Sequence, residues 1–187
     1  MLPSLSQPEA LNRTSLTHEE TCLLRRYAED TWRSFVALAC STGLPCDQVN
    51  SQGSQAGYTS PTNIAAYIWS TIAAQEMGII HPGEALMRLS QTLRALRRLE
   101  RHSPSGQFYN WYDPFTGEKL LCWAQSGERI YPFLSSVDNG WLAVALIMIR
   151  NAYPSLRNLS LETLDRMDFG FYYDPGTGLL RGGYWPG

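Results

Sequence analysis

The stretch FYNWYDPFTGEKL at Phe108–Leu120 returns in shortened form as FYYDPGTGL at Phe171–Leu179. Both copies place Tyr-Asp-Pro-x-Thr-Gly after a segment with helical periodicity, and STGLP at Ser41–Pro45 is a weaker third copy. Aspartate accepts turn hydrogen bonds, proline fixes φ and glycine supplies positive φ, so the motif predicts a tight turn. Copies spaced by roughly 60 to 75 residues indicate helical hairpins stacked side by side, because one hairpin cannot bury its apolar face alone.

Outward from these turns, apolar periodicity and helix caps predict five helices. Thr17 and Glu20 form a capping box that opens the first helix. Ser60 and Pro61 open the second, with the serine as N-cap and the proline in the first helical position. The predicted helices cover 17–40, 61–77, 82–101, 138–152 and 159–167.

The segment between the third and fourth helices, residues 103–135, is rich in Gly, Pro and aromatic residues. A structureless loop of this length is unusual in a compact domain, which indicates a functional segment or a small hairpin within 106–134. In the fourth helix we expect Asp138 at the N-cap and Trp141 on the inward, apolar face.

Composition narrows the class of protein. The chain has 187 residues, of which 44% are hydrophobic, enough for one domain or part of one. A net charge of -2 without a basic run argues against a nucleic-acid partner. No apolar run reaches the roughly 18–20 residues of a membrane span, so no membrane contact is expected. No secretory signal is recognisable either, which favours a cytoplasmic location. We expect residues 1–16 to be a mobile leader and 17–187 to form the domain.

The four cysteines are Cys22, Cys40, Cys46 and Cys122. They form no CxxC pair and histidine is scarce, so we expect neither a metal site nor another cofactor. Cys40 and Cys46 flank a short turn and are able to bridge in an oxidising compartment, but four unpaired thiols are the simpler interpretation.

Four stretches together resemble the bacterial glucoamylase-like family, and the glycoamylase domain of cyclic β-1,2-glucan synthases is similar at the same motifs. They are YTSPTNIAAYIWS at Tyr58–Ser70, LERHSPSGQFYNWYDPFTGEKL at Leu99–Leu120, SSVDNGWLAVAL at Ser135–Leu146 and MDFGFYYDP at Met167–Pro175. The resemblance implies an all-α fold, an (α/α)6 toroid of the six-hairpin barrel type with a sugar groove formed by loops at one end. This chain supplies only about the first five helices of such a barrel.

Two hypotheses about function follow from the resemblance. The first is a glycoside hydrolase or transglycosylase that acts on an oligo- or polysaccharide. The alternative is a catalytically inactive carbohydrate-binding or structural fragment, which self-associates or needs a partner to supply the missing C-terminal half. The hairpin repeat further predicts that the loops at 46–60, 103–118, 135–141 and 168–175 gather at one end of the molecule.

Glycoside hydrolysis requires two carboxylates that flank the scissile bond. Asp138 is the first candidate, because it lies at a helix start beside Asn139 and Trp141, in a motif that lines the groove of the family. Asp113 is the second, since aromatic residues and Asn110 surround it, although the turn motif already explains it. Hydroxyls, amides and flat aromatic faces suited to sugars are offered by Tyr58, Thr59, Ser60, Asn63, Tyr109, Asn110, Trp111, Tyr112, Asn139 and Trp141. Packing between hairpins is the competing explanation for Trp141.

Overall fold

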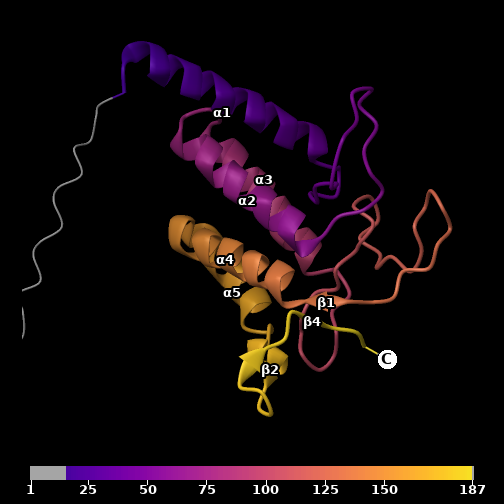
Figure 1. Cartoon of the computed structure of the whole chain (residues 1–187). Helices are drawn as coiled ribbons and strands as arrows, with labels where there is room; N and C mark the ends of the chain where they lie inside the picture. Colours follow the sequence, from indigo (N-terminus) through magenta and orange to yellow (C-terminus); the bar gives the residue numbers. More distant parts are fainter. Residues whose placement is uncertain (1–15, 187) are drawn as a thin grey trace, which may run out of the picture.

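The computed structural model describes residues 16–186, which contain five α-helices (Figure 1). The helices are α1 (His18–Leu38), α2 (Pro61–Glu76), α3 (Pro82–Leu96), α4 (Ser136–Ala152) and α5 (Arg157–Leu164). All five predicted helices are therefore present. The predicted leader, residues 1–16, lies outside the described residues except for Leu16.

The first two helices begin at the caps that the sequence predicts. The backbone N–H of Glu20 donates to the Thr17 hydroxyl at 3.2 Å, and the Thr17 N–H donates to the Glu20 carboxylate at 2.8 Å. Ser60 caps α2 in the same reciprocal way with Asn63, and Pro61 lies in the first turn. Both helices thus begin where a side chain replaces the hydrogen-bond partner that the first turn lacks.

The third helix is shorter than the predicted range of 82–101, because α3 ends at Leu96. Beyond it, Arg101 forms an isolated antiparallel bridge with Phe108. The Arg101 guanidinium lies 4.2 Å from the centre of the Phe108 ring and donates to the Thr163 carbonyl at 3.0 Å. Burial lowers the pKa of this guanidinium to about 10. A tertiary contact of this kind leaves no trace in helical periodicity, so the prediction of a longer helix was wrong.

The other helix boundaries differ less. The fourth helix begins at Ser136, earlier than the predicted Asp138. The fifth helix covers Arg157–Leu164 instead of 159–167, and a short 3-10 helix, η1 (Pro154–Leu156), precedes it. Differences of this size are common at helix ends, where hydrogen bonding frays or tightens.

The helices pack in two layers of antiparallel hairpins. α2 lies along α4, α3 packs on α2, α5 packs on α4, and α3 also contacts α5. α1 contacts α2 at the edge of the assembly (Figure 1). Fully buried aliphatic side chains from α2, α3 and α4 fill the space between the layers: Ile64, Ile68, Leu89, Leu93, Leu96, Leu142 and Leu146. Each such side chain contributes roughly 1.5–3 kcal/mol when it leaves water, so this core holds the hairpins together.

Two apolar faces remain uncovered. Of the residues in α1, only Trp32 is buried, whereas Leu23, Leu24 and Tyr27 are exposed. In α4, Trp141 is 47% exposed, although the periodicity predicted it on the inward face. That prediction was wrong in part: Leu142 and Leu146 take the inward positions, and Trp141 lies at the edge of the core, where one side of it contacts Trp69 of α2.

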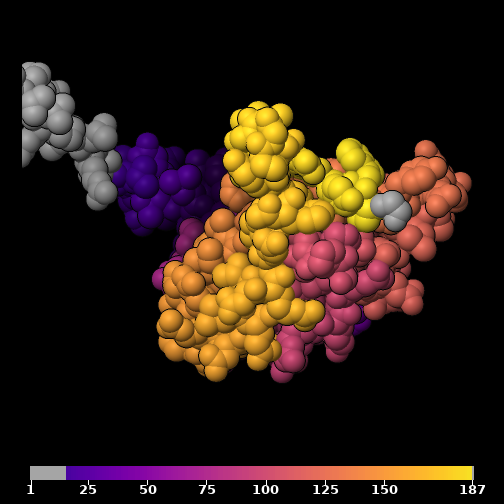
Figure 2. Space-filling model, turned by 90° about the horizontal axis from the view of Figure 1, so that it is seen from below, coloured from indigo at the N-terminus to yellow at the C-terminus, as the bar shows by residue number. Residues whose placement is uncertain are grey.

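Short strands form two antiparallel pairs among the described residues. β1 (Leu134–Ser135), directly before α4, pairs with β4 (Gly183–Tyr184). β2 (Tyr173–Asp174) pairs with β3 (Leu179–Leu180), and η2 (Phe169–Tyr172) precedes them. The second pair stands out from the helical body as a yellow projection in Figure 2.

The long segment between α3 and α4 contains three consecutive turns of one design. Isolated antiparallel bridges close them at Arg101–Phe108, Tyr112–Lys119 and Cys122–Arg129. The β2–β3 pair closes a fourth turn of the same length, and each turn has a glycine at positive φ before its second strand: Gly106, Gly117, Gly127 and Gly178. The sequence predicted a small hairpin within 106–134, and the structure contains two complete ones in that range.

Candidate functional site

The long loops meet at one end of the helices, as predicted, while the short connections lie at the other end (Figure 1). Thr59 and Tyr112 exchange backbone hydrogen bonds of 2.9 and 3.1 Å, which join the loop before α2 to the loop after α3. The Asp168 N–H donates to the Ser105 carbonyl at 2.9 Å and brings the segment after α5 to the same place. The N-termini of α2 and α4 open into this loop cluster.

At the start of α2, Asn63 connects the helix cap to a carboxylate. Its Oδ1 accepts from the Ser60 N–H at 3.1 Å, and its Nδ2 donates to Asp47 Oδ1 at 2.9 Å. The Tyr58 hydroxyl lies close to Asp47 and accepts from Gln48 Nε2 at 3.2 Å. Burial, together with the negative charge of Asp47, raises the pKa of Tyr58. The predicted sugar-binding residues Tyr58, Ser60 and Asn63 thus belong to one polar network.

At the start of α4, the carboxylate of Asp138 contacts the neighbouring helix α2. Ser135 is the N-cap and accepts from the Asp138 N–H at 3.1 Å, so the expectation that Asp138 itself is the cap was wrong. Instead, Asp138 Oδ1 accepts from the Thr62 hydroxyl of α2 at 2.7 Å. The side chain is partly exposed, and a carboxylate in the first turn of a helix is stabilised by the helix dipole.

Asn139, the next residue, is completely buried. Its Oδ1 accepts from the Phe108 N–H at 2.8 Å, and its Nδ2 donates to the carbonyls of Phe108 and Ser135, both at 2.9 Å. This amide therefore fixes the aromatic loop against the start of α4, and its place in the interior keeps it from a ligand at the surface.

Asp113, the second predicted carboxylate, stabilises the turn in which it lies. Its Oδ1 accepts from the N–H groups of Phe115 at 2.7 Å and Thr116 at 3.1 Å. Asp174 does the same in the last turn, where it accepts from Gly176 N–H at 3.0 Å. The turn motif accounts for both aspartates.

The predicted aromatic residues divide into buried and accessible ones. Tyr112 is fully buried and donates to the Glu100 carbonyl at 2.6 Å, and burial strongly raises its pKa. Tyr109 is also buried, like the hydroxyl-bearing Thr59 and Ser60. Asn110 is partly exposed, although its Oδ1 is buried and has no partner among the described residues.

Two accessible aromatic groups remain beside the polar network. Trp141 packs edge to face on Trp69 of α2, with ring centroids 5.1 Å apart, on the same face of α2 and α4 as Thr62 and Asp138. Tyr58, Trp111 and Trp123 form a second group, in which each pair of rings lies 5.3–5.5 Å apart. Rings that are partly exposed at a polar site are suited to stacking on sugars.

Three further residues belong to this region although the sequence patterns did not indicate them: Thr62, Trp69 and Trp123. Thr62 directly follows the predicted Ser60-Pro61 cap. Its hydroxyl in the first turn of the helix was therefore a signal in the sequence that could have identified it. Trp69 lies on the same face of α2 about two turns further along, at an i, i+7 spacing from Thr62. Trp123 lies shortly before Ser126-Gly127, and the same Ser-Gly pair occurs in the turn at Ser105-Gly106. A turn motif that allows serine in place of threonine before the glycine would have indicated the turn that contains Trp123.

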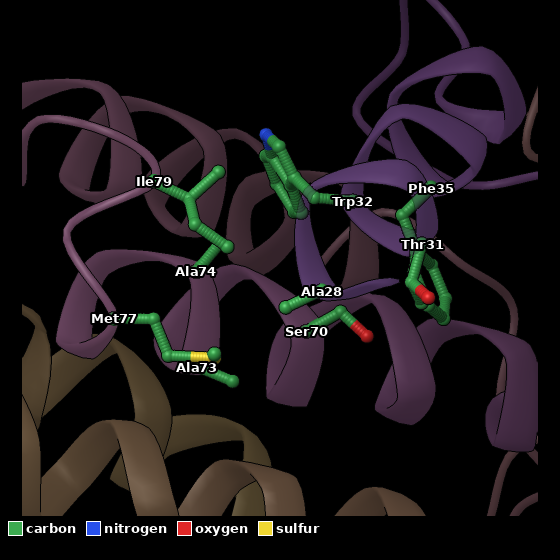
Figure 3. A pocket seen from close by; sticks show the side chains of 9 residues that line it. All are labelled: Ala28, Thr31, Trp32, Phe35, Ser70, Ala73, Ala74, Met77 and Ile79. Atoms are coloured by element: carbon green, nitrogen blue, oxygen red, sulfur yellow. The ribbon is translucent and has the colours of Figure 1, made fainter. Parts of the chain in front are cut away.

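An apolar hollow of ≈ 190 Å³ lies elsewhere, between α1 and α2 (Figure 3). Ala28, Trp32 and Phe35 of α1 face Ser70 of α2 and Met77, the residue that follows α2, across it. Its lining offers few hydrogen-bonding groups, so it suits an apolar side chain rather than a sugar.

Residues 16–186 contain neither a membrane-spanning helix nor a cluster of metal ligands. No helix in this range is long and apolar enough to cross a membrane. The same residues contain no group of three or more His, Cys, Asp and Glu side chains that is able to hold a metal ion.

Known proteins resemble the chain in sequence and in fold. The cyclic β-(1,2)-glucan synthase NdvB of Rhizobium meliloti is 34% identical over 131 residues, which are 67% of this chain and 4% of the synthase. A putative glucoamylase of Bacteroides fragilis superposes with a TM-score of 0.69 at 18% identity, over 95% of this chain and 43% of that protein. An endo-β-1,2-glucanase of Chitinophaga pinensis gives 0.70 at 15% identity, over 92% and 42%.

These likenesses confirm the glucoamylase-like resemblance and the partial (α/α)6 toroid fold. The chain spans less than half of the length of the solved structures that it matches. A family model matches residues 26–170, so the chain belongs to the family described as "Protein of unknown function (DUF3131)".

Proposed function

We propose that this chain binds a glucan at its loop end and supplies one wall of a glycoside-hydrolase-like site centred on Asp138. The observation that carries the proposal is the hydrogen bond from Thr62 to Asp138, which joins the N-termini of two packed helices beside an exposed tryptophan. The hydrogen bond from Thr62 holds the carboxylate in place, and the cap of α4 uses the backbone N–H of Asp138 and not its carboxylate. The relatives support a glucan as the ligand, since their names include a β-1,2-glucan synthase and an endo-β-1,2-glucanase.

Hydrolysis of a glycosidic bond needs one carboxyl group as acid and a second as base or nucleophile. Asp138 is our first choice. For the second we favour Asp47 over Asp113, because the consecutive residues Thr62 and Asn63 hold Asp138 and Asp47. The Asp113 carboxylate is occupied by two N–H groups of its own turn.

Binding needs less of the site than catalysis does. Trp141 offers a flat apolar face, and Asn63 with Tyr58 offers polar groups, so one wall is sufficient to hold a sugar. Catalysis requires carboxyl groups whose environments set different pKa values, and an open site leaves them in water. We therefore expect this chain alone to bind glucans with weak or no hydrolysis.

Calorimetric titration with sophorotriose and with longer β-1,2-gluco-oligosaccharides tests the proposal. We expect Trp141→Ala and Asp138→Ala each to weaken binding about 3- to 10-fold, by loss of stacking or of hydrogen bonds. The matched control is Glu76→Ala, which removes an exposed carboxylate at the far end of α2 and should leave binding unchanged. Absence of binding by the unaltered chain to every glucan tried would refute the proposal.

A structural role in a larger toroid is the second candidate. The observations that favour it are the exposed leucines of α1 and the apolar hollow of ≈ 190 Å³ beside Trp32, which suits a large side chain of a further helix. Light scattering after size-exclusion chromatography measures the mass in solution. A dimer that dissociates on Leu24→Glu, without any affinity for glucans, would favour this role over the first.

A further inference from the structure

Two hairpins outside the Asp138 region enclose a second hollow. One is closed by the bridge between Val49 and Gln55, and the other is the turn from Cys122 to Arg129, which projects from the body in Figure 2. Between them lies a space of ≈ 200 Å³ that we call the amide hollow. It is lined by Gln48, Val49, Asn50, Ser54, Gln55, Ala56 and Gln125.

The lining of the amide hollow contains four carboxamides and no ionised side chain. A carboxamide both donates and accepts, so this lining matches a neutral ligand that is rich in hydroxyl groups. An anion would find no cationic partner here, and a metal ion would find no carboxylate. The lining therefore favours a neutral, hydroxyl-rich ligand over an anion or a metal ion.

Part of this hydrogen-bonding capacity already serves the fold. Gln55 Nε2 donates to the Ala37 carbonyl at 2.9 Å, and Asn50 Oδ1 accepts from two N–H groups of its own turn. Within the described residues, no hydrogen bond occupies the Gln125 amide, and Gln48 uses only its Nε2, toward Tyr58. The groups left over include donors and acceptors, as a sugar requires.

An aromatic wall adjoins the amide hollow. Trp123 lies in the same hairpin as Gln125, two residues before it. Its ring packs edge to face on Tyr58 and on Trp111, with ring centroids 5.3 Å and 5.5 Å apart. Because Gln48 donates to the Tyr58 hydroxyl, the wall and the amide lining share a contact. Aromatic faces beside amides are the usual means by which a protein holds a pyranose ring.

We propose that the amide hollow is a second sugar-binding site, separate from the contact between Thr62 and Asp138, which takes one neutral pyranose residue through Gln48 and Gln125. Its volume lies below the roughly 300–1,000 Å³ of pockets for drug-sized ligands, so it has room for one ring and not for a chain. The hydrogen bond that Thr62 donates to Asp138 and the one that its neighbour Asn63 donates to Asp47, beside Tyr58, mark a polar path between the two sites.

This inference rests on the proposed function for the identity of the sugar, and it predicts a dependence on chain length. A short oligosaccharide occupies only one site, whereas a longer one reaches both and gains affinity from linkage. We expect Gln125→Ala to weaken binding of long β-1,2-gluco-oligosaccharides about 3- to 10-fold and to leave sophorotriose binding at Asp138 unchanged. Gln52→Ala is the matched control, because it removes an exposed glutamine from the same pair of hairpins outside the lining.

The location of binding is tested by NMR of the side-chain amide groups in the 15N-labelled chain. The Gln125→Ala and Gln48→Ala spectra assign the two signals, and sophorotriose and longer oligosaccharides are the probes. Shifts at both glutamines with the longer probe would support the amide hollow. Shifts confined to Asn63 and the Trp141 indole would overturn it and leave the proposed function standing. Shifts confined to the two glutamines would overturn the Asp138 site instead, and no shift with any probe would overturn both.

Discussion

The N-termini of α2 and α4 begin alike and use their third residues differently. In each, a serine accepts from the N–H group of the third helical residue, Ser60 from Asn63 at 3.2 Å and Ser135 from Asp138 at 3.1 Å. Asn63 returns a bond to the Ser60 N–H at 3.1 Å. Asp138 accepts from Thr62 of the other helix at 2.7 Å. The Asn63 side-chain oxygen is thus used by its own cap, whereas the Asp138 carboxylate makes its contact outside its own helix.

The next residue of each helix continues the contrast. In α2 it is Ile64, which lies in the apolar core. In α4 it is Asn139, whose buried amide holds the backbone of Phe108. At this position the α2 start is thus stabilised by apolar burial, whereas the α4 start is held by an amide that binds a loop from a distant part of the sequence.

The largest effect is expected for Asn139→Ala. The change leaves the N–H and C=O groups of Phe108 unpaired in the interior, and we expect the free energy of unfolding to fall by about 2–4 kcal/mol. Urea denaturation followed by circular dichroism measures it. Asn151→Ala, at the exposed end of the same helix, is the control, with an expected change below about 0.5 kcal/mol. A loss as small as that of the control would mean that the α4 start does not depend on the Phe108 loop.

A smaller effect is expected for Asn63→Ala, which removes the return bond of the α2 cap and the bond to Asp47. We expect a loss of about 1–2 kcal/mol in the free energy of unfolding. Ser135→Ala, which removes only the cap of α4, should cost about 1 kcal/mol in the same denaturation experiment. Equal losses for the two variants would erase the difference between the helix starts.

For Asp138→Ala we expect a loss of about 0.5–1 kcal/mol in the free energy of unfolding, because the partly exposed carboxylate loses one hydrogen bond, from Thr62, and its interaction with the helix dipole. The change in stability of this variant is compared with its loss of glucan affinity in the calorimetric titration. A side chain that is dispensable for stability and required for binding acts on the ligand. A loss as large as that of Asn63→Ala would instead assign Asp138 to the fold.

The smallest effect concerns Tyr58, whose pKa is raised by burial and by Asp47. Since the folded pKa lies above the ordinary value, the neutral phenol persists to a higher pH, and its contribution to stability is lost as the pH rises through that raised pKa. We expect Asp47→Asn to lower the pKa of Tyr58 part of the way back. Ultraviolet difference titration, corrected with Tyr58→Phe, measures the shift. An unchanged pKa in Asp47→Asn would separate Tyr58 from the α2 network.

The sequence was a good guide wherever structure is local. Caps at Thr17 and Ser60 and the apolar faces of α2, α3 and α4 depend on residues within one or two turns, and they predicted the helices. The gathering of the loops at one end followed from the hairpin repeat. The end of α3 and the exposure of Trp141 were missed, since both depend on which distant segment covers a helix face.

The candidate site was predictable only in part. Asp138 was selected from its place at a helix start, but the partner that holds it, Thr62, lies on another helix and no pattern in the chain connects the two. Burial separated the predicted sugar-binding residues in a way that residue type does not reveal, since Tyr112 and Asn139 are interior while Trp111 and Trp141 are accessible.

From the pairing of α2 with α4 we also expect a definite order of folding. Short connections join α2 to α3 and α4 to α5, so each of these hairpins closes at little entropic cost. The contact between α2 and α4 spans α3 and three turns, and contacts of such high sequence separation slow the folding rate. We expect the two hairpins to form early and to dock late. The hydrogen bond between Thr62 and Asp138 then becomes a product of the rate-limiting step, and the loop end matures last.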